Sequence, residues 1–168
     1  MENFVYEYPT KVYFGKGAVS QHLSGILADY GPHVLLAYGG GSIKRNGVYE
    51  ELMGILKAAG KTVTEFASIM SNPTFVKVRE GARLAREHKI DLVLAVGGGS
   101  VVDCCKIVCA QAVTDEDLWD LEMVQHKAPT AAAPIPLGAV VTASGTGAEM
   151  NGGAVITNES ANKKSIGK

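Results

Sequence analysis

The feature that most constrains the fold is the alternation of short apolar runs with longer amphipathic segments. Three apolar runs, each bounded by glycine, lysine or a charged helix end, have the length and composition of buried strands: residues 33–38, 62–66 and 90–96. Around them, apolar residues recur every three or four positions, which predicts helices over residues 19–30, 48–59 and 75–85. Strands alternating with helices predict parallel βαβ units with helices on both faces of a sheet. The predicted fold class is therefore α/β.

The remaining segments extend this pattern at both ends of the chain. Residues 4–17 contain the breakers Pro9 and Gly15 and predict an extended segment, either a hairpin or an edge strand. A helix is predicted from Ser100 to about Ala112, and residues 131–158 hold two more strand-like runs separated by small and turn-forming residues. The 168 residues contain no low-complexity linker, which predicts one domain over residues 1–168.

Composition and charge exclude several classes of function. The 16 basic residues are scattered among 17 acidic ones, with a formal net charge of −1, so no basic face is predicted for nucleic acid. No apolar run reaches the ~20 residues of a membrane helix, and the first residues lack the pattern of a signal peptide. We therefore expect a cytoplasmic protein with no nucleic-acid or membrane partner. The three cysteines share one segment, which favours reduced thiols over disulfides.

A phosphate-binding turn is predicted where the third apolar run ends. Gly97, Gly98, Gly99 and Ser100 join this run to the next helix, so N–H groups without helical partners converge at the positive end of a helix dipole. Glycine allows unusual φ values and lets a diphosphate approach the main chain closely. The alternative is a tight turn that binds nothing. Neither G-x-G-x-x-G nor a P-loop is present, since Val102 replaces the last glycine and G-K-[ST] does not occur.

The first turns of the same helix carry an acid and a lysine. Ser100 and Asp103 have the spacing of a capping box, although Asp103 could instead face a bound ligand. Lys106 follows three residues later, which predicts an ion pair on the helix surface. Cys105 and Cys109 lack nearby histidines, and we interpret them as small buried apolar residues rather than metal ligands.

Another glycine run, residues 39–41, follows the first apolar run. Many NAD sites place an acid near such a strand end to hold the ribose 2′-hydroxyl, whereas a 2′-phosphate requires a hydroxyl or a cation. The glycines are followed here by Ser42, Lys44 and Arg45, a composition that favours NADP over NAD. The alternative is a flexible, solvent-exposed turn.

Two other segments are candidates for the site. Asn72 is predicted to cap a helix with Pro73 at its first position, which explains this stretch without any ligand. Residues 142–151, TASGTGAEMN, carry more hydroxyls and glycines than a turn requires, which predicts a ligand-lining loop. The four histidines lack metal-ligand spacing.

Together these motifs resemble the iron-containing (group III) alcohol dehydrogenases, and among them the NADP-dependent butanol dehydrogenase and aldehyde reductase branch. The matches span nearly the whole chain: FGKG from Phe14, YGGGSIKRNG from Tyr38, SNPT from Ser71, AVGGGSVVDCCK from Ala95, and the 142–151 loop followed by GAVIT from Gly153. The pattern GGGSxxDxxK in order with the others is far more specific than any single motif.

The resemblance implies a Rossmann-like three-layer domain with a mostly parallel sheet, as in the amino-terminal domain of dehydroquinate synthase, that binds NADP. It implies that the diphosphate is held by Gly97, Gly98, Gly99 and Ser100, with Asp103 near the nicotinamide. By the same resemblance, the adenosine ribose and its 2′-phosphate lie beside Gly40, Gly41 and Ser42. The rest of the site would be lined by Asn72, Thr142, Thr146, Asn151 and Lys164. Related NAD enzymes carry an acid at about the position of Gly39.

The resemblance also implies metal ligands, an aspartate and three histidines, in a helical domain that follows the cofactor domain. Residues 1–168 contain no segment that corresponds to this helical domain. We therefore assign no metal ligand and no catalytic residue, and expect a fragment or a truncated product that binds NADPH with negligible turnover. The complete enzyme would hold iron or zinc and interconvert small alcohols and aldehydes. A homodimer is one expectation for its assembly.

Two alternatives stay open at this point. A phosphofructokinase-like or NAD-kinase-like phosphotransferase also uses a glycine-rich loop with a serine after a strand. Such sites require an acid within the loop to organise Mg²⁺, where this chain has Gly99. The other alternative is a non-catalytic nucleotide-binding module.

Overall fold

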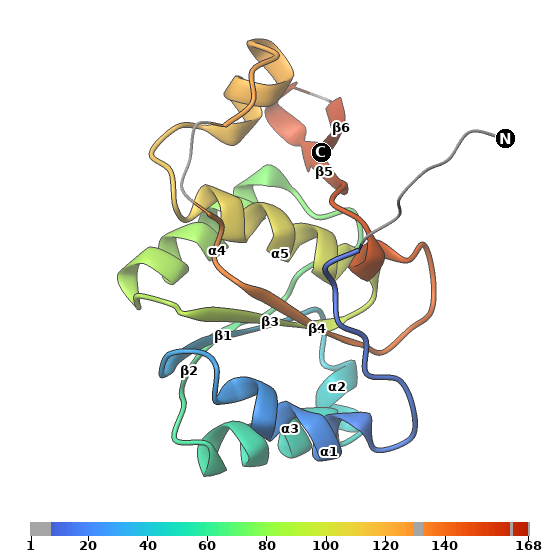
Figure 1. The fold of residues 1–168 in the computed structure, drawn as a ribbon. Helices are drawn as coiled ribbons and strands as arrows, with labels where there is room; N and C mark the ends of the chain where they lie inside the picture. The colour runs from blue at the N-terminus through green and yellow to red at the C-terminus, as the bar shows by residue number, and fades with distance from the viewer. Residues whose placement is uncertain (1–7, 130–132, 162, 168) are drawn as a thin grey trace, which may run out of the picture.

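The computed structural model describes residues 8–129, 133–161 and 163–167 of the chain. In these residues a parallel four-stranded sheet has the order β2-β1-β3-β4, and a separate antiparallel pair is formed by β5 and β6 (Figure 1). The strand bounds are β1 (His33–Tyr38), β2 (Thr62–Phe66), β3 (Leu92–Gly97), β4 (Leu137–Val141), β5 (Ala154–Asn158) and β6 (Lys163–Gly167). The predicted α/β class with a parallel sheet is confirmed.

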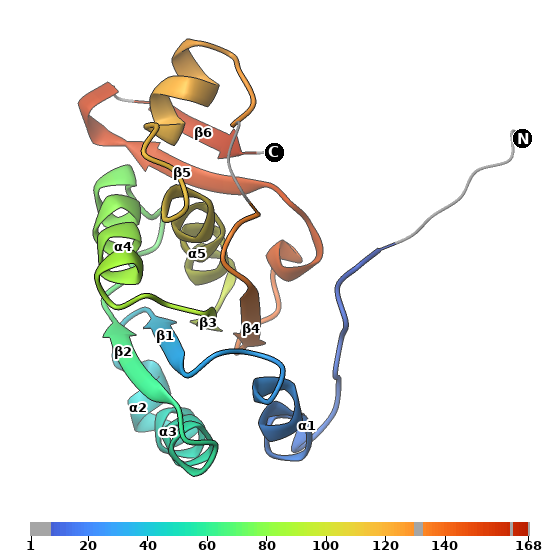
Figure 2. The same ribbon diagram turned by 60° about the vertical axis from the view of Figure 1, so that its left-hand side comes forward.

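Helices cover both faces of the parallel sheet, as Figure 2 shows. One face packs against α1 (Ala18–Leu27), α2 (Ser42–Arg45) and α3 (Val48–Ala58), and the other against α4 (Phe75–Glu87) and α5 (Gly99–Gln111). Three single turns complete the described helical structure: the π-helix η1 (Asp120–Val124) and the 3-10 helices η2 (Ala148–Met150) and η3 (Glu159–Ala161). No helix in the described part of the chain is long and apolar enough to cross a bilayer.

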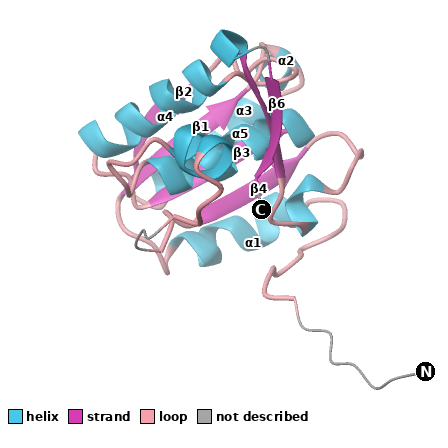
Figure 3. Ribbon diagram, turned by 90° about the horizontal axis from the view of Figure 1, so that it is seen from above, coloured by secondary structure: helices cyan, strands magenta, loops and turns pink. Residues whose placement is uncertain are grey.

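The sheet separates two apolar cores because side chains alternate across its faces. Leu36, which points toward α3, packs with Leu52 and Leu56, all of them fully buried. On the other face, Phe66 packs with Val108 of α5. The strand β5 packs against α4 and α5 on their far side, so that β5 and β6 form an additional layer (Figure 3).

One predicted element differs from the structure. The described part of the opening segment, residues 8–17, forms no strand, and residues 4–7 lie outside the described residues. A strand requires a neighbour for its backbone N–H and C=O groups, and this segment runs away from the sheet without pairing to a described strand (Figure 2). The prediction of a hairpin or edge strand is therefore wrong for residues 8–17.

Candidate cofactor site

Two glycine turns leave the sheet side by side at its carboxyl edge. β1 and β3 are parallel neighbours with Tyr38 opposite Val96, so the turns that follow them begin at the same level. The side chain of Val101 lies between them: its Cγ2 is 3.8 Å from where a Cβ on Gly39 would lie and 2.8 Å from that of Gly97. The structure thus brings the two turns together at the edge where ligands bind in open α/β sheets.

The second turn presents unpaired amides at the start of α5. Gly97 ends β3 with φ at +154°, and Gly98 precedes the helix with φ −92° and ψ −169°. Gly99 and Ser100 are the first two residues of this 13-residue helix, and their N–H groups find no acceptor within the described part of the chain. Two free donors at the positive end of a helix dipole form a site for an anion.

Two predicted helix caps are wrong. Ser100 lies inside α5 and makes no capping hydrogen bond, because Gly98 takes the N-cap position. Asn72 has φ at +54° and does not cap α4. The N-cap is Thr74, whose hydroxyl accepts a hydrogen bond from the Lys77 amide at 3.2 Å. Thr74 has the extended backbone that an N-cap requires, so the cap lies two residues after the predicted Asn72, and α4 begins at Phe75 as the apolar pattern predicts.

The loop after β4 forms a wall beside the second turn. The Thr142 amide donates to the Gly97 carbonyl at 3.0 Å. A Cβ built on Gly99 would lie 3.3 Å from the Thr146 hydroxyl oxygen, and one on Gly98 would lie 3.9 Å from the Ala143 Cβ. Thr142 and Thr146 are both exposed. The structure therefore places these two predicted residues next to the anion-binding turn, with their hydroxyls accessible.

Asp103 and Asn151 are engaged within the protein. The Asp103 carboxylate accepts a hydrogen bond from the Val155 amide at 3.0 Å, and its other oxygen is 3.5 Å from the Lys106 ammonium. This confirms the predicted pairing of Asp103 with Lys106. Lys106 also donates to the Asn151 side-chain oxygen at 3.2 Å and to the Gly153 carbonyl at 2.6 Å.

The first glycine turn is open to solvent. Gly40, Gly41 and Ser42 are exposed, and Ser42 begins the short helix α2, with its amide bonded to the Gly40 carbonyl at 2.9 Å. The Arg45 side chain folds back toward this turn, with Nη1 3.3 Å from where a Cβ on Gly41 would lie. The turn therefore combines accessible backbone, a hydroxyl and a guanidinium.

A cluster of polar aromatic residues beside this turn escaped the sequence analysis. The Tyr38 hydroxyl donates to Glu65 at 2.9 Å, and the Lys44 ammonium lies 5.4 and 4.6 Å from the ring centres of Tyr38 and Tyr49. Hydrogen bonding from Tyr49, reinforced by Tyr38 and by the charge of Lys44, lowers the pKa of Glu65. The hydrogen bond to Glu65 raises the pKa of Tyr49 to about 12. Because the cluster depends on the pairing of β1 with β2, a search for local motifs could not find it.

Lys164 and two of the cysteines complete the residues considered in the sequence analysis. Lys164 pairs with Thr157 in the β5–β6 ribbon, but its side chain lies outside the described residues. Cys105 and Cys109 are buried as predicted, and burial raises the pKa of the Cys109 thiol to about 12. No three His, Cys, Asp or Glu side chains cluster as metal ligands in the described part of the chain.

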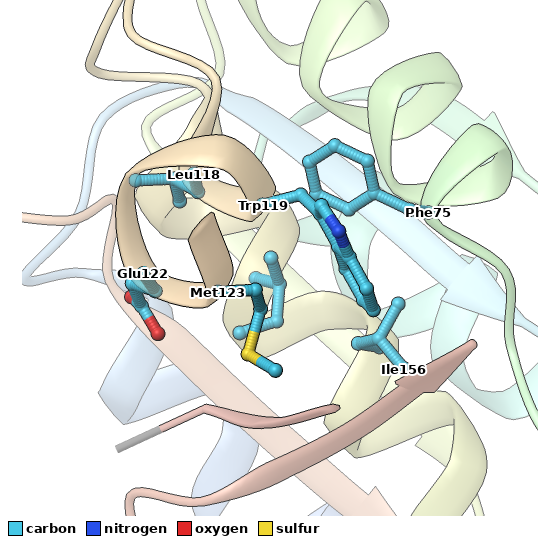
Figure 4. Close-up of a pocket in the computed structure, with 7 residues that line it drawn as sticks. Phe75, Leu118, Trp119, Glu122, Met123 and Ile156 are labelled. Carbon is cyan, nitrogen blue, oxygen red and sulfur yellow. The ribbon is translucent and has the colours of Figure 1, made fainter. Parts of the chain in front are cut away.

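A small apolar pocket lies elsewhere, where η1 meets α4, α5 and β5 (Figure 4). Glu122 is its acidic member, and burial raises the pKa of this carboxyl group. None of the predicted cofactor-binding residues lines the pocket, whose lining consists of Phe75, Ile107, Leu118, Trp119, Glu122, Met123 and Ile156. The candidate site is therefore the open edge formed by the glycine turns, not this pocket.

The chain is similar to known proteins in sequence and in fold. Residues 9–168 match the family model described as iron-containing alcohol dehydrogenase. The chain is 49% identical over 166 residues to the probable NADH-dependent butanol dehydrogenase 2 of Bacillus subtilis (strain 168), covering 99% of this chain and 42% of that protein. It is 38% identical over 167 residues to the NADPH-dependent aldehyde reductase YqhD of Escherichia coli (strain K12), covering 98% and 41%.

Solved structures agree with the sequence matches. The crystal structure of NADH-dependent butanol dehydrogenase A from Thermotoga maritima superposes with a TM-score of 0.89 and 42% identity, covering 99% of this chain and 41% of that one. The chain thus spans about two-fifths of the length of the relatives it matches. The matches support the Rossmann-like fold and do not favour a phosphotransferase. The chain belongs to the iron-containing alcohol dehydrogenase family.

Proposed function

We propose that residues 1–168 form the dinucleotide-binding domain of an NADP-dependent alcohol dehydrogenase that interconverts small alcohols and aldehydes. The observation that carries this proposal is the pair of adjacent glycine turns at one sheet edge. One of them presents the amides of Gly99 and Ser100, which have no acceptor among the described residues. These amides bind the diphosphate of the cofactor, and Gly40, Gly41 and Ser42 receive the adenosine ribose. Thr142 and Thr146 line the cofactor on the side of the loop.

The reaction requires a hydride to pass between the nicotinamide and a carbonyl carbon. This chain contributes orientation to that step: the turn at α5 fixes the diphosphate, and the facing loop limits the space in which the cofactor can move. A metal held by the rest of the complete enzyme would stabilise the developing alkoxide. The described residues do not fit a metal site, since they offer no cluster of three ligating side chains, and no metal-dependent step is assigned to them.

The first glycine turn supports a preference for NADP. Residues 39–42 of the turn include no acid, and the Arg45 guanidinium lies beside Gly41. The neighbouring carboxylate of Glu65 accepts a hydrogen bond from the Tyr38 hydroxyl. Guanidinium groups bind phosphate through charge-assisted hydrogen bonds worth about 1.5–3 kcal/mol. The names of the relatives do not decide between the two cofactors, because the Bacillus subtilis protein is named NADH-dependent and the Escherichia coli protein NADPH-dependent.

Titration of the 168-residue chain with NADPH and with NADH tests the proposal by calorimetry or by nicotinamide fluorescence. We expect NADPH to bind more tightly, and Arg45→Gln to weaken NADPH about ten-fold or more while NADH is little affected. Arg83→Gln is the matched control: it removes the same charge from α4, where Arg83 pairs with Glu87.

Each failure has a separate meaning. If neither NADPH nor NADH binds, the proposal that the chain is a cofactor-binding domain is refuted. Equal or tighter binding of NADH by the parent chain would refute only the preference for NADP. Tighter binding of ATP with Mg²⁺ than of either dinucleotide would favour the phosphotransferase alternative.

A further inference from the structure

The loop between β4 and β5, residues 142–153, has little regular structure of its own. It contains the single 3-10 turn η2, closed by a bond from the Met150 amide to the Gly147 carbonyl at 2.8 Å. Most of its residues are exposed, with Ala148 as the buried anchor. A segment with few internal bonds opens easily unless other elements hold it. The contacts between this loop and other elements therefore determine how rigidly the loop is held beside the second glycine turn.

Two side chains of α5 hold the far end of the loop. Lys106 bonds to the Gly153 carbonyl at 2.6 Å and to the Asn151 side chain at 3.2 Å. Asp103 accepts the Val155 amide at 3.0 Å, at the first residues of β5. Asn151 extends the connection inward, because its amide nitrogen donates to the Gly147 carbonyl at 3.0 Å. The contacts of the pair thus reach from β5 back to the start of η2.

Burial makes the loss of one partner from these contacts more costly than it is in a surface ion pair. The side chains of Asp103 and Lys106 are only 16% and 13% exposed. Charges that are partly removed from water depend on their partners, because an unpaired one has lost hydration without compensation. Lys106 has three oxygen acceptors among the described residues, two of which belong to the loop. Lys106 is therefore the centre of the connection.

The same helix thus presents the anion-binding amides and holds the facing loop. Resting on the function proposed above, we infer that Lys106, with Asp103 as its partner on α5, is a positioning residue: it fixes the 142–153 loop beside Gly99 and supports cofactor binding through that loop. This inference rests on the position of the Thr146 hydroxyl beside Gly99 and on the bonds from Lys106 to the Asn151 side chain and the Gly153 carbonyl.

The test compares Lys106→Met and Asp103→Asn in the full chain. We expect amide hydrogen exchange in residues 147–155 to become about ten-fold faster in Lys106→Met, and NADPH to bind several-fold more weakly. Asp103→Asn keeps an oxygen for the Val155 amide and loses the charge, so its effect is smaller. Amides in β1 and β3 keep their exchange rates in both variants.

Lys77→Met is the matched control, because Lys77 forms the same three-residue-spaced pair with Glu80 on α4 and is 10% exposed. It is expected to lower stability without changing loop exchange or NADPH affinity. The inference is overturned if Lys106→Met behaves like this control, or if its loop exchanges faster while NADPH affinity is unchanged. It is also overturned if Lys106→Met weakens NADPH binding with no change in loop exchange, which would indicate direct contact between Lys106 and the cofactor. A parent chain that binds no NADPH would refute the proposed function, while the exchange rates would still report on the loop.

Discussion

Replacing Gly97 with alanine tests the backbone geometry on which the candidate site depends. Gly97 has φ at +154°, a conformation that residues with a side chain rarely adopt. An added Cβ would also lie 2.8 Å from the Cγ2 of Val101 and 3.2 Å from its Cβ. Carbon atoms in ordinary contact are about 3.5–4.0 Å apart, so either the turn or the start of α5 must move.

The two penalties have separate magnitudes. Holding a non-glycine residue in such a backbone region costs about 1–3 kcal/mol, and forcing a methyl group into a packed contact costs about 1–3 kcal/mol. A shift of Val101 relieves part of the second penalty, so the sum is not fully additive. We expect Gly97→Ala to lose about 3 kcal/mol of unfolding free energy and to weaken NADPH binding, because the amides of Gly99 and Ser100 are displaced.

Urea denaturation measures the loss of unfolding free energy in Gly97→Ala. A double-mutant cycle with Val101→Ala separates the contribution of backbone strain from that of the contact with Val101. With a urea dependence of about 1–3 kcal/mol per molar, the midpoint falls by roughly 1 M or more. Val101→Ala removes the methyl carbon at 2.8 Å but leaves the φ strain in place. The double variant should therefore be more stable than the sum of the single losses predicts, by about 1 kcal/mol.

Two results would refute this reasoning. An unfolding free energy for Gly97→Ala within about 0.5 kcal/mol of the parent would mean that the turn does not require glycine. A strictly additive cycle would mean that Val101 is not the group that closes against Gly97. Unchanged NADPH affinity in a destabilised variant would separate the geometry of this turn from cofactor binding.

Further predictions concern packing, capping and burial. Gly81→Ala should lower the unfolding free energy by about 1 kcal/mol, because its Cβ would lie 2.7 Å from buried side chains, while Gly54→Ala in α3, with nothing within 4 Å, should raise it by up to about 1 kcal/mol. Thr74→Ala should cost about 1 kcal/mol through loss of the α4 cap; an unchanged thermal midpoint would contradict the capping role. Burial raises the pKa of Cys104 and Cys109 to about 12, so the unfolded chain loses thiol protons first as pH rises. The stability that the buried thiols contribute is therefore fully present below the ordinary thiol pKa of about 8.5 and is lost as pH rises toward 12. Equal urea midpoints at about pH 7.5 and 9.5 would argue against thiol burial.

Much of the architecture was predictable from local patterns. The predicted bounds of the first two strands agree with β1 and β2, and the third strand begins at Leu92 rather than two residues earlier. These predictions succeed because a buried parallel strand and an amphipathic helix each impose a periodicity on their own residues. The caps failed because helix starts depend on the backbone angles of single residues, and Gly98 and Thr74 adopted those angles in place of the predicted Ser100 and Asn72.

By itself, the sequence determined the α/β class, the two glycine turns and the membership of the family. Each follows from residues close together in the chain, whose patterning or backbone freedom acts locally. Only the tertiary structure decided what the polar side chains do. Asp103 meets Val155 across 52 positions, and Tyr38 meets Glu65 across 27. Such contacts depend on strand order and helix packing, which bring distant segments to hydrogen-bonding distance.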